Sequence, residues 1–255
     1  MIDEDTSPQS SPDDDHGNAG SRRRADYNLP VRALKVRDIK TPGYRKGGVA
    51  REAPSPNLPK IKPTKLRIIG GQMRGRGVMY SGDRSTRPMK DSIRETLFNI
   101  LGKSVQGTIA FDLFAGTGVL AIESLSRGSV KAIAVEKAGL TAKNIRSSAD
   151  NIGIGKELEV LTGDAFRIGP ARMREHHDLE NSETAPWIVY LCPPYSMWME
   201  MTDKMFELIQ VTASLAPQGS QIVVETDKFF DPTSLPFDNW DIRPKGNVTL
   251  AFLEL

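Results

Sequence analysis

The sequence contains a single cysteine, Cys192, so it cannot form an intramolecular disulfide. Its three histidines and one cysteine nowhere show the spacing of zinc ligands, and we expect no bound metal. No apolar run approaches the roughly 18 to 20 residues of a membrane-spanning helix, and the N-terminus lacks a signal-peptide pattern. These absences favour a soluble, cytoplasmic protein that binds no membrane, and we expect a monomer.

Charge is distributed unevenly along the chain. Residues 1–19 carry six acids and no Lys or Arg, residues 20–102 carry 20 basic against 6 acidic side chains, and residues 103–255 carry 14 against 20. Residues 1–64 have few apolar positions at any regular period, which predicts a disordered tail. The basic side chains of this tail fit either nucleic-acid contact or a solvated tail.

Residues 65–102 differ from the tail in pattern. Two short strands, 66–69 and 77–80, are expected around a glycine-rich basic stretch, and apolar spacing predicts a helix over about 88–101. This segment carries eight basic and three acidic side chains. It is therefore predicted to be a small basic hairpin and helix that precede the main domain.

Residues 103–255 alternate apolar strands with amphipathic helices, which predicts an α/β domain with a doubly wound, mainly parallel sheet. The expected strands are 109–114, 132–135, 158–162, 187–191, 221–225 and 248–253, and the expected helices are 119–127, 140–151 and about 199–215. Residues 175–186 are interpreted as an acidic surface insertion with His176 and His177 in solvent.

A glycine-rich turn follows the first of these strands and contains Gly116 and Gly118. Its pattern fits the loose fingerprint of dinucleotide-binding proteins. Asp112, four residues before the first glycine, argues against a dinucleotide, because its carboxylate would repel a pyrophosphate. A cationic ligand would be attracted instead. S-adenosylmethionine carries an ammonium and a sulfonium group, and it is therefore the cofactor that we expect.

Two more acids end the next two strands. Glu136 follows the second strand, where a carboxylate can accept both ribose hydroxyls of a nucleotide. Asp164, followed by Ala165, ends the third strand and could take the adenine amino group. Each acid alone could equally be a helix cap or a turn residue. The convergence of three acids on one sheet edge favours adenosylmethionine.

The fourth strand runs into Cys192, Pro193, Pro194 and Tyr195. This strand end is similar to that of amino-methyltransferases, which reads Asp or Asn, Pro, Pro and an aromatic residue. An exocyclic amine on a base is a poor nucleophile because its lone pair is delocalised into the ring. A side-chain oxygen and a proline carbonyl accept its two N–H groups and localise the lone pair, while the aromatic ring stacks on the flipped-out base.

From about Leu66 onward the chain resembles the RsmD family of 16S ribosomal RNA guanine-N2 methyltransferases. The resemblance rests on linked motifs that occur in one order: Arg67-Ile68-Ile69-Gly70-Gly71, Arg74-Gly75-Arg76, Arg87-Pro88, Arg94 to Leu101, Asp112 to Gly118 and Glu123 to Gly128.

The family resemblance implies an S-adenosylmethionine-dependent enzyme of the class I methyltransferase fold. It also implies that the basic hairpin and helix of residues 65–102 help to hold ribosomal RNA or an assembling small ribosomal subunit. The candidate RNA contacts are Arg74, Arg76, Arg87 and Arg94.

Cys192 departs from the family pattern, because a thiol is a weak hydrogen-bond acceptor. Three interpretations follow. The protein methylates guanine N2 with the Pro193 carbonyl and Tyr195; it has become an RNA-binding homologue without turnover; or Cys192 is the nucleophile of a pyrimidine C5 methyltransferase. A DNA amino-methyltransferase is a further alternative, since the Pro-Pro-aromatic strand end does not distinguish DNA from RNA.

Overall fold

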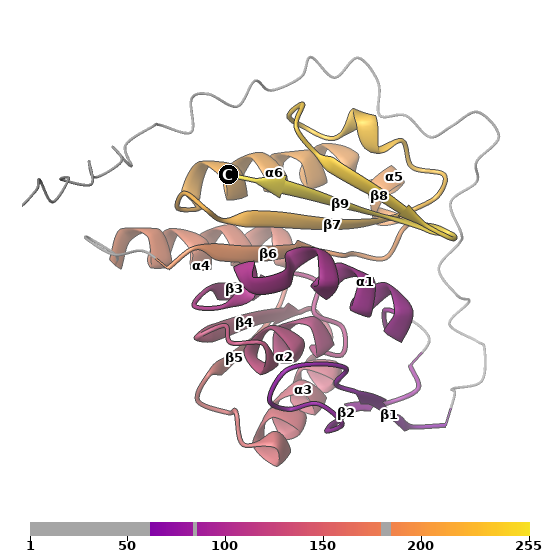
Figure 1. Cartoon of the computed structure of the whole chain (residues 1–255), viewed down its shortest axis with the longest axis vertical. Coiled ribbons are helices and arrows are strands. Elements are labelled where there is room, and N and C mark those ends of the chain that lie inside the picture. The colour runs from indigo at the N-terminus through magenta and orange to yellow at the C-terminus, as the bar shows by residue number, and fades with distance from the viewer. Residues whose placement is uncertain (1–61, 84–85, 180–184) are drawn as a thin grey trace, which may run out of the picture.

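The structure is a computed structural model that describes residues 62–83, 86–179 and 185–255 (Figure 1). The disordered tail expected at 1–64 lies outside these residues up to position 61. The elements in chain order are β1 (Thr64–Arg67), β2 (Gly77–Tyr80), α1 (Asp91–Leu101), η2 (Gly102–Val105), β3 (Ile109–Asp112), α2 (Val119–Ser126), β4 (Lys131–Glu136), α3 (Gly139–Ile152), β5 (Leu158–Thr162), α4 (Ala165–Leu179), β6 (Trp187–Leu191), α5 (Met197–Glu200), α6 (Thr202–Leu215), β7 (Gln221–Asp227), η3 (Pro232–Ser234), β8 (Asp241–Lys245) and β9 (Val248–Glu254).

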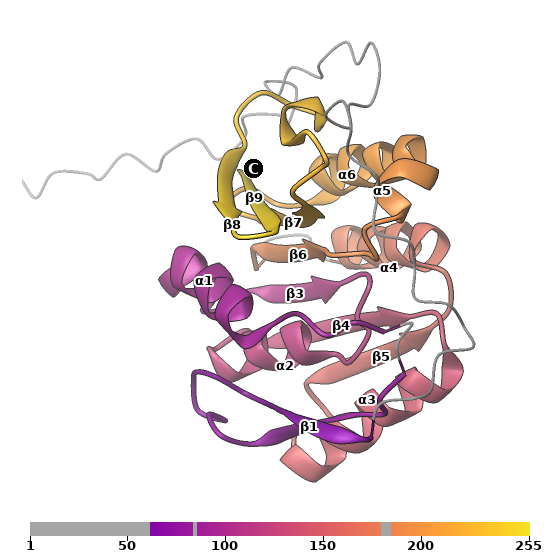
Figure 2. The same cartoon turned by 90° about the vertical axis from the view of Figure 1, so that its right-hand side faces the viewer.

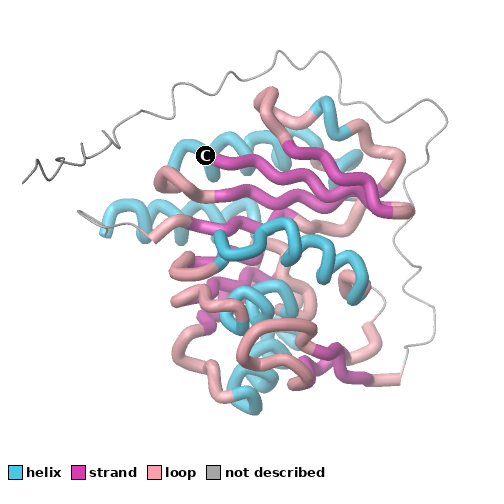
Figure 3. Tube along the Cα trace, viewed as in Figure 1, coloured by secondary structure: helices cyan, strands magenta, loops and turns pink. Residues whose placement is uncertain are grey.

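A seven-stranded sheet in the order β5-β4-β3-β6-β7-β9-β8 forms the centre of the domain (Figure 3). The first five strands in this order are parallel, and β9 pairs antiparallel with both β7 and β8. The expected doubly wound, mainly parallel sheet is therefore confirmed. The strand order reverses at β3, which lies between β4 and β6, and ligands of such sheets bind at the carboxyl ends beside this point.

Helices cover both faces of the sheet (Figure 2). One apolar cluster joins the sheet to α1, α2, α3 and the small β1–β2 sheet, and the other joins it to α4, α5 and α6. Every residue of β3 and β6 is buried, as expected for mainly apolar strands covered on both faces, and the buried residues include Asp112 at the end of β3. This packing fixes the carboxyl ends of the central strands relative to one another.

The β1–β2 hairpin pairs Thr64 with Tyr80 and packs against the main domain. The backbone N–H of Met79 donates to Ser148 Oγ on α3 at 3.0 Å, and the N–H of Gln72 donates to the Ser126 carbonyl at 2.7 Å. The first strand covers 64–67 instead of the expected 66–69, because Arg67 and Thr64 pair with Gly77 and Tyr80, the two ends of β2.

Two expected elements and the expected exposure of His176 were wrong, and one strand was not predicted. The helix expected over 199–215 is two helices separated at Met201, and α4 runs through 165–179 where the sequence suggested an insertion beginning at 175. His176 is 8% exposed instead of solvated, because α4 turns its ring edge onto Phe111 with centroids 5.6 Å apart. Strand β8 was not predicted, since Pro244 disfavours a strand except at the sheet edge, where β8 lies.

Candidate active site

A cavity of about 970 Å³ opens at the carboxyl edge of the sheet. It brings together most of the residues that the sequence singled out: Arg87, Gly116, Glu136, Asp164, Ala165, Cys192, Pro193, Pro194 and Tyr195. Phe114, Phe166, Glu225 and Lys228 also line it and were not anticipated. Asp112 and Gly118 lie outside its lining, as do Arg74, Arg76 and Arg94. One continuous cavity thus joins the ends of β4, β5, β6 and β7.

The glycine-rich turn between β3 and α2 requires glycine at two positions. Gly116 and Gly118 have φ values of 53° and 73°, which L side chains rarely adopt. A Cβ atom on Gly118 would lie 2.7 Å from Cγ2 of Ile145, and one on Gly116 would lie 3.1 Å from Cγ2 of Thr86. The turn therefore keeps its backbone close to α3 and to the cavity.

Glu136 links this turn to the end of β4 through hydrogen bonds. Its Oε2 accepts the N–H of Gly116 at 2.9 Å, and its Oε1 accepts the N–H of Ala138 at 2.7 Å. Burial raises the pKa of its carboxyl group. The carboxylate is half-buried on the cavity wall, where its remaining lone pairs can accept hydroxyl groups of a ligand.

Asp164 caps α4, since its Oδ1 accepts the N–H of Phe166 at 2.9 Å. The Phe166 ring meets the Phe114 ring edge to face, with centroids 5.8 Å apart. Both rings line the cavity beside Asp164. This corner combines a carboxylate with two aromatic faces, which suits a planar heterocycle bearing an amino group.

Asp112 lies buried behind the glycine turn. It is 1% exposed, and its carboxyl group faces the backbone N–H groups of Ala121 and Phe114. Burial, assisted by the charge of Glu136, raises its pKa to about 7. Asp112 therefore lies next to the glycine turn and not on the cavity wall, and its contact with a cofactor stays a prediction.

The wall at the end of β6 is formed by Pro193, Pro194 and Tyr195 with Cys192 half-buried beside them. The Tyr195 hydroxyl donates to Oε1 of Glu225 at 2.9 Å, which holds its ring against the end of β7. Burial raises the pKa of the Cys192 thiol, and the negative charges of Glu225 and Asp112 raise it further. The thiol therefore stays neutral, which disfavours a nucleophilic role.

We expect Cys192 to react slowly with iodoacetamide at pH 8, because little of its thiol is ionised. Its rate in the folded protein should lie at least about tenfold below that of the urea-unfolded protein. Intact-mass measurement suffices, since the chain has one cysteine. Equal rates in the two states would show that the thiol ionises normally and would reopen the nucleophile hypothesis.

The RNA-contact prediction was wrong for Arg94. Its side chain is fully buried, with Nε 3.0 Å from Oε1 of Glu123, and Nη2 donates to the Arg67 carbonyl at 2.7 Å. The apolar spacing placed Arg94 on the polar face of α1, but Arg94 lies on the buried face with Leu97 and Leu101, where it meets Glu123 of α2 and the end of β1. Arg94 is therefore a structural residue.

Arg74, Arg76 and Arg87 are exposed. Arg76 donates to the Ile152 carbonyl, and Arg87 stands at the cavity together with other cations. The cations that line the cavity are Arg87, Lys90, Lys137, Lys228 and Lys245. RNA contact by the three exposed arginines stays a prediction.

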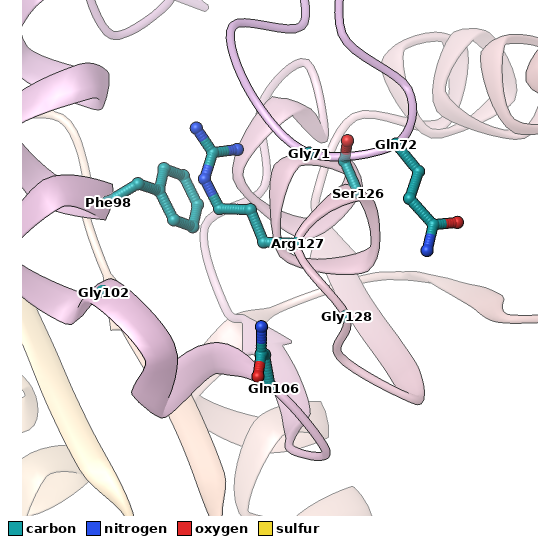
Figure 4. Close-up of a pocket in the computed structure, with 8 residues that line it drawn as sticks. All are labelled: Gly71, Gln72, Phe98, Gly102, Gln106, Ser126, Arg127 and Gly128. Carbon is teal, nitrogen blue, oxygen red and sulfur yellow. The ribbon is translucent and has the colours of Figure 1, made fainter.

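A second hollow of about 720 Å³ lies at the other end of α2, lined by Phe98 and Arg127 among others (Figure 4). The Arg127 guanidinium lies over the Phe98 ring at 4.1 Å from its centroid and pairs with the buried Glu123. The Arg127 guanidinium is thus already engaged by Phe98 and Glu123. The hollow therefore lies where α1, α2 and the hairpin pack together.

Among the residues that the structure describes, no helix is long and apolar enough to cross a membrane. Within the same residues, no three His, Cys, Asp or Glu side chains are grouped so that they could hold a metal ion.

Comparison with known proteins gives consistent matches over most of the chain. The family model described as Conserved hypothetical protein 95 matches residues 66–254. Ribosomal RNA small subunit methyltransferase D from Escherichia coli K12 is 43% identical over 179 residues, which cover 70% of this chain and 83% of that protein. The protein of the same name from Haemophilus influenzae is 27% identical over 193 residues, which cover 75% of this chain and 93% of that protein. The solved structure of the putative methyltransferase yhhF from Escherichia coli is 27% identical in sequence and has a TM-score of 0.58. The match covers 75% of this chain and 98% of that chain.

The sheet order, the glycine turn and the cavity beside the switch point define a class I S-adenosylmethionine-dependent methyltransferase fold. The family match identifies which family of this class the chain represents. The chain belongs to the RsmD family, as its sequence motifs suggested.

Proposed function

We propose that this protein transfers a methyl group from S-adenosylmethionine to the N2 atom of a guanine in small-subunit ribosomal RNA. The observation that carries the proposal is the continuity of the cavity. It runs from the acids at the ends of β4 and β5 to the Pro-Pro-Tyr wall at the end of β6. A methyl donor and a flipped-out base can therefore occupy it together.

The cofactor half of the cavity fits adenosylmethionine. Glu136 would accept the ribose hydroxyls, Asp164 would take the adenine amino group, and the turn at Gly116 allows close approach. Asp112 lies beside the glycine turn, outside the cavity lining, and its negative charge would favour a ligand that carries positive charge across the turn. The bound cofactor would supply an activated methyl group, and these residues would orient it.

The target half fits an exocyclic amine on a base. The carbonyl oxygen of Pro193 would accept one N–H of the amine, and the Tyr195 ring would stack on the base. Arg87 and Lys228, at the same cavity, would approach the phosphates of the flanking nucleotides. These contacts favour a flipped nucleotide in an RNA strand, as the names of the curated relatives suggest.

The alternatives fit less well. A non-catalytic RNA-binding homologue needs no base-sized space beside Pro193 and Tyr195, yet the cavity reaches both residues. A pyrimidine C5 methyltransferase needs a thiolate, and the surroundings of Cys192 keep its thiol neutral. A DNA substrate is less favoured by the basic hairpin and by the family.

The experiment is transfer of labelled methyl from adenosylmethionine to naked small-subunit RNA, to assembling small-subunit particles and to duplex DNA. The proposal expects incorporation into RNA or particles that is saturable in adenosylmethionine, and none into DNA. Wild type and Cys192→Ser should both be active, because the thiol takes no part in the reaction. Calorimetric binding of adenosylmethionine without transfer to any RNA would favour the non-catalytic alternative.

A further inference from the structure

The end of β7 brings a carboxylate next to Cys192. Strands β6 and β7 are parallel, and Leu191 pairs with Val224, so the next residues, Cys192 and Glu225, lie side by side at the cavity edge. Neighbouring strands lie about 4.8 Å apart. A glutamate is one methylene longer than an aspartate, and it can reach toward a ligand held at the end of β6.

Two hydrogen bonds fix Glu225 in place. Its Oε1 accepts the Tyr195 hydroxyl at 2.9 Å, and its backbone carbonyl accepts the indole N–H of Trp198 at 2.9 Å. The residue is 8% exposed and lines the cavity with Cys192 and Pro193. No hydrogen bond to Oε2 is found among the described residues, which leaves this oxygen available to a ligand.

We propose that Glu225 supplies the side-chain acceptor for the target amine that Cys192 cannot supply, and that it takes the proton released on methyl transfer. This inference rests on the function proposed above. The Pro193 carbonyl would accept one N–H of the amine, and Oε2 of Glu225 would accept the other. Compared with the family pattern, the side-chain acceptor would thus lie on β7 instead of at the end of β6.

The proton balance of the step requires such a group. The lone pair of the amine nitrogen forms the new nitrogen–carbon bond, while the carbon–sulfur bond breaks and its electrons stay on sulfur. The nitrogen then carries a positive charge and must lose one of its two protons. The Glu225 carboxylate takes this proton, becomes neutral, and returns it to solvent through the open cavity before the next turnover.

The surroundings of Glu225 suit proton exchange near neutral pH. Burial raises its pKa to about 7, and the Tyr195 hydroxyl and Arg87 limit the rise. The neutral Cys192 thiol faces it from β6. Above pH 7 the carboxylate can accept a proton, and below pH 7 it is protonated and cannot. Hence kcat should fall about tenfold per pH unit below 7.

The test compares wild type with Glu225→Gln, a change that keeps the size of the side chain and an acceptor for Tyr195. We expect kcat to fall about 100-fold, KM to change less than about threefold, and the inflection near pH 7 to disappear. Glu254→Gln, an exposed acid on β9, is the matched control and should behave as wild type.

A rescue variant separates the acceptor role from a merely structural one. Adding Cys192→Asn to Glu225→Gln places an amide oxygen where the family pattern has one. The kcat of this double variant should be at least about tenfold higher than that of Glu225→Gln alone. Infrared titration gives a second readout: the protonated-carboxyl band that titrates near pH 7 should weaken in Glu225→Gln by the contribution of Glu225, while the contribution of Asp112, whose pKa is also about 7, should remain.

The outcomes separate the two proposals. If wild type methylates no RNA, the proposed function fails and this inference fails with it. If wild type is active and Glu225→Gln retains its kcat and pH profile, the inference alone is overturned. A lost kcat that Cys192→Asn does not restore would also contradict it, because the two side chains would then not share a role.

Discussion

Replacing Arg94 by alanine should lower the free energy of unfolding by about 3–5 kcal/mol. The Glu123 carboxylate is fully buried and accepts the backbone N–H of Ile69 at 2.7 Å as well as the guanidinium groups of Arg94 and Arg127. Removing Arg94 leaves this negative charge under-compensated in the interior. It also frees the Arg67 carbonyl at the end of β1.

Urea denaturation monitored by circular dichroism measures this loss. Arg74→Ala, which alters an exposed arginine on the β1–β2 hairpin, is the control and should shift stability by less than about 0.5 kcal/mol. A loss below about 1 kcal/mol in Arg94→Ala would contradict the structural role.

Replacing Glu136 by alanine should raise the Kd for adenosylmethionine about 100-fold. Hydrogen bonds to charged groups contribute about 1.5–3 kcal/mol each, and every 1.4 kcal/mol is a factor of ten in affinity. The substitution removes the ribose acceptor and also the two backbone contacts that hold Gly116 and Ala138. The glycine turn would then lose the side chain that fixes it to the end of β4.

Isothermal titration calorimetry measures the Kd directly. Glu157→Ala removes an exposed acid just before β5 and is the control for the change in net charge. Its affinity should equal that of wild type. If Glu136→Ala binds adenosylmethionine as tightly as wild type does, the assignment of the ribose end of the cavity is wrong.

The sequence predicted the parts of the fold and site that depend on local chemistry. Strands β2, β5 and β6 agree with their expected bounds because uninterrupted or alternating apolar runs are bounded by turn residues. Gly116 and Gly118 were identifiable because positive φ angles select glycine. Helix α4 was missed because Gly169 and Pro170 signal a loop, although the helix continues through both.

The features that the sequence could not reveal depend on pairings between distant segments. Arg94 was expected on the solvent-facing side of α1, but it lies on the buried side, where it pairs with Glu123 of α2 and donates to the Arg67 carbonyl of β1. Glu225 lies in β7, two residues before the strand ends at Asp227, and only the parallel pairing of β6 with β7 places it beside Cys192. Acids at strand ends therefore need a known strand order before a role can be assigned to them.

The account depends most directly on the identity of the methylated nucleoside. Small-subunit RNA treated with the wild-type protein and adenosylmethionine should be digested to nucleosides and analysed by mass spectrometry. The account predicts N2-methylguanosine, formed by wild type and by Cys192→Ser alike. A 5-methylpyrimidine that disappears in Cys192→Ser, or no methylated nucleoside although adenosylmethionine binds, would contradict it.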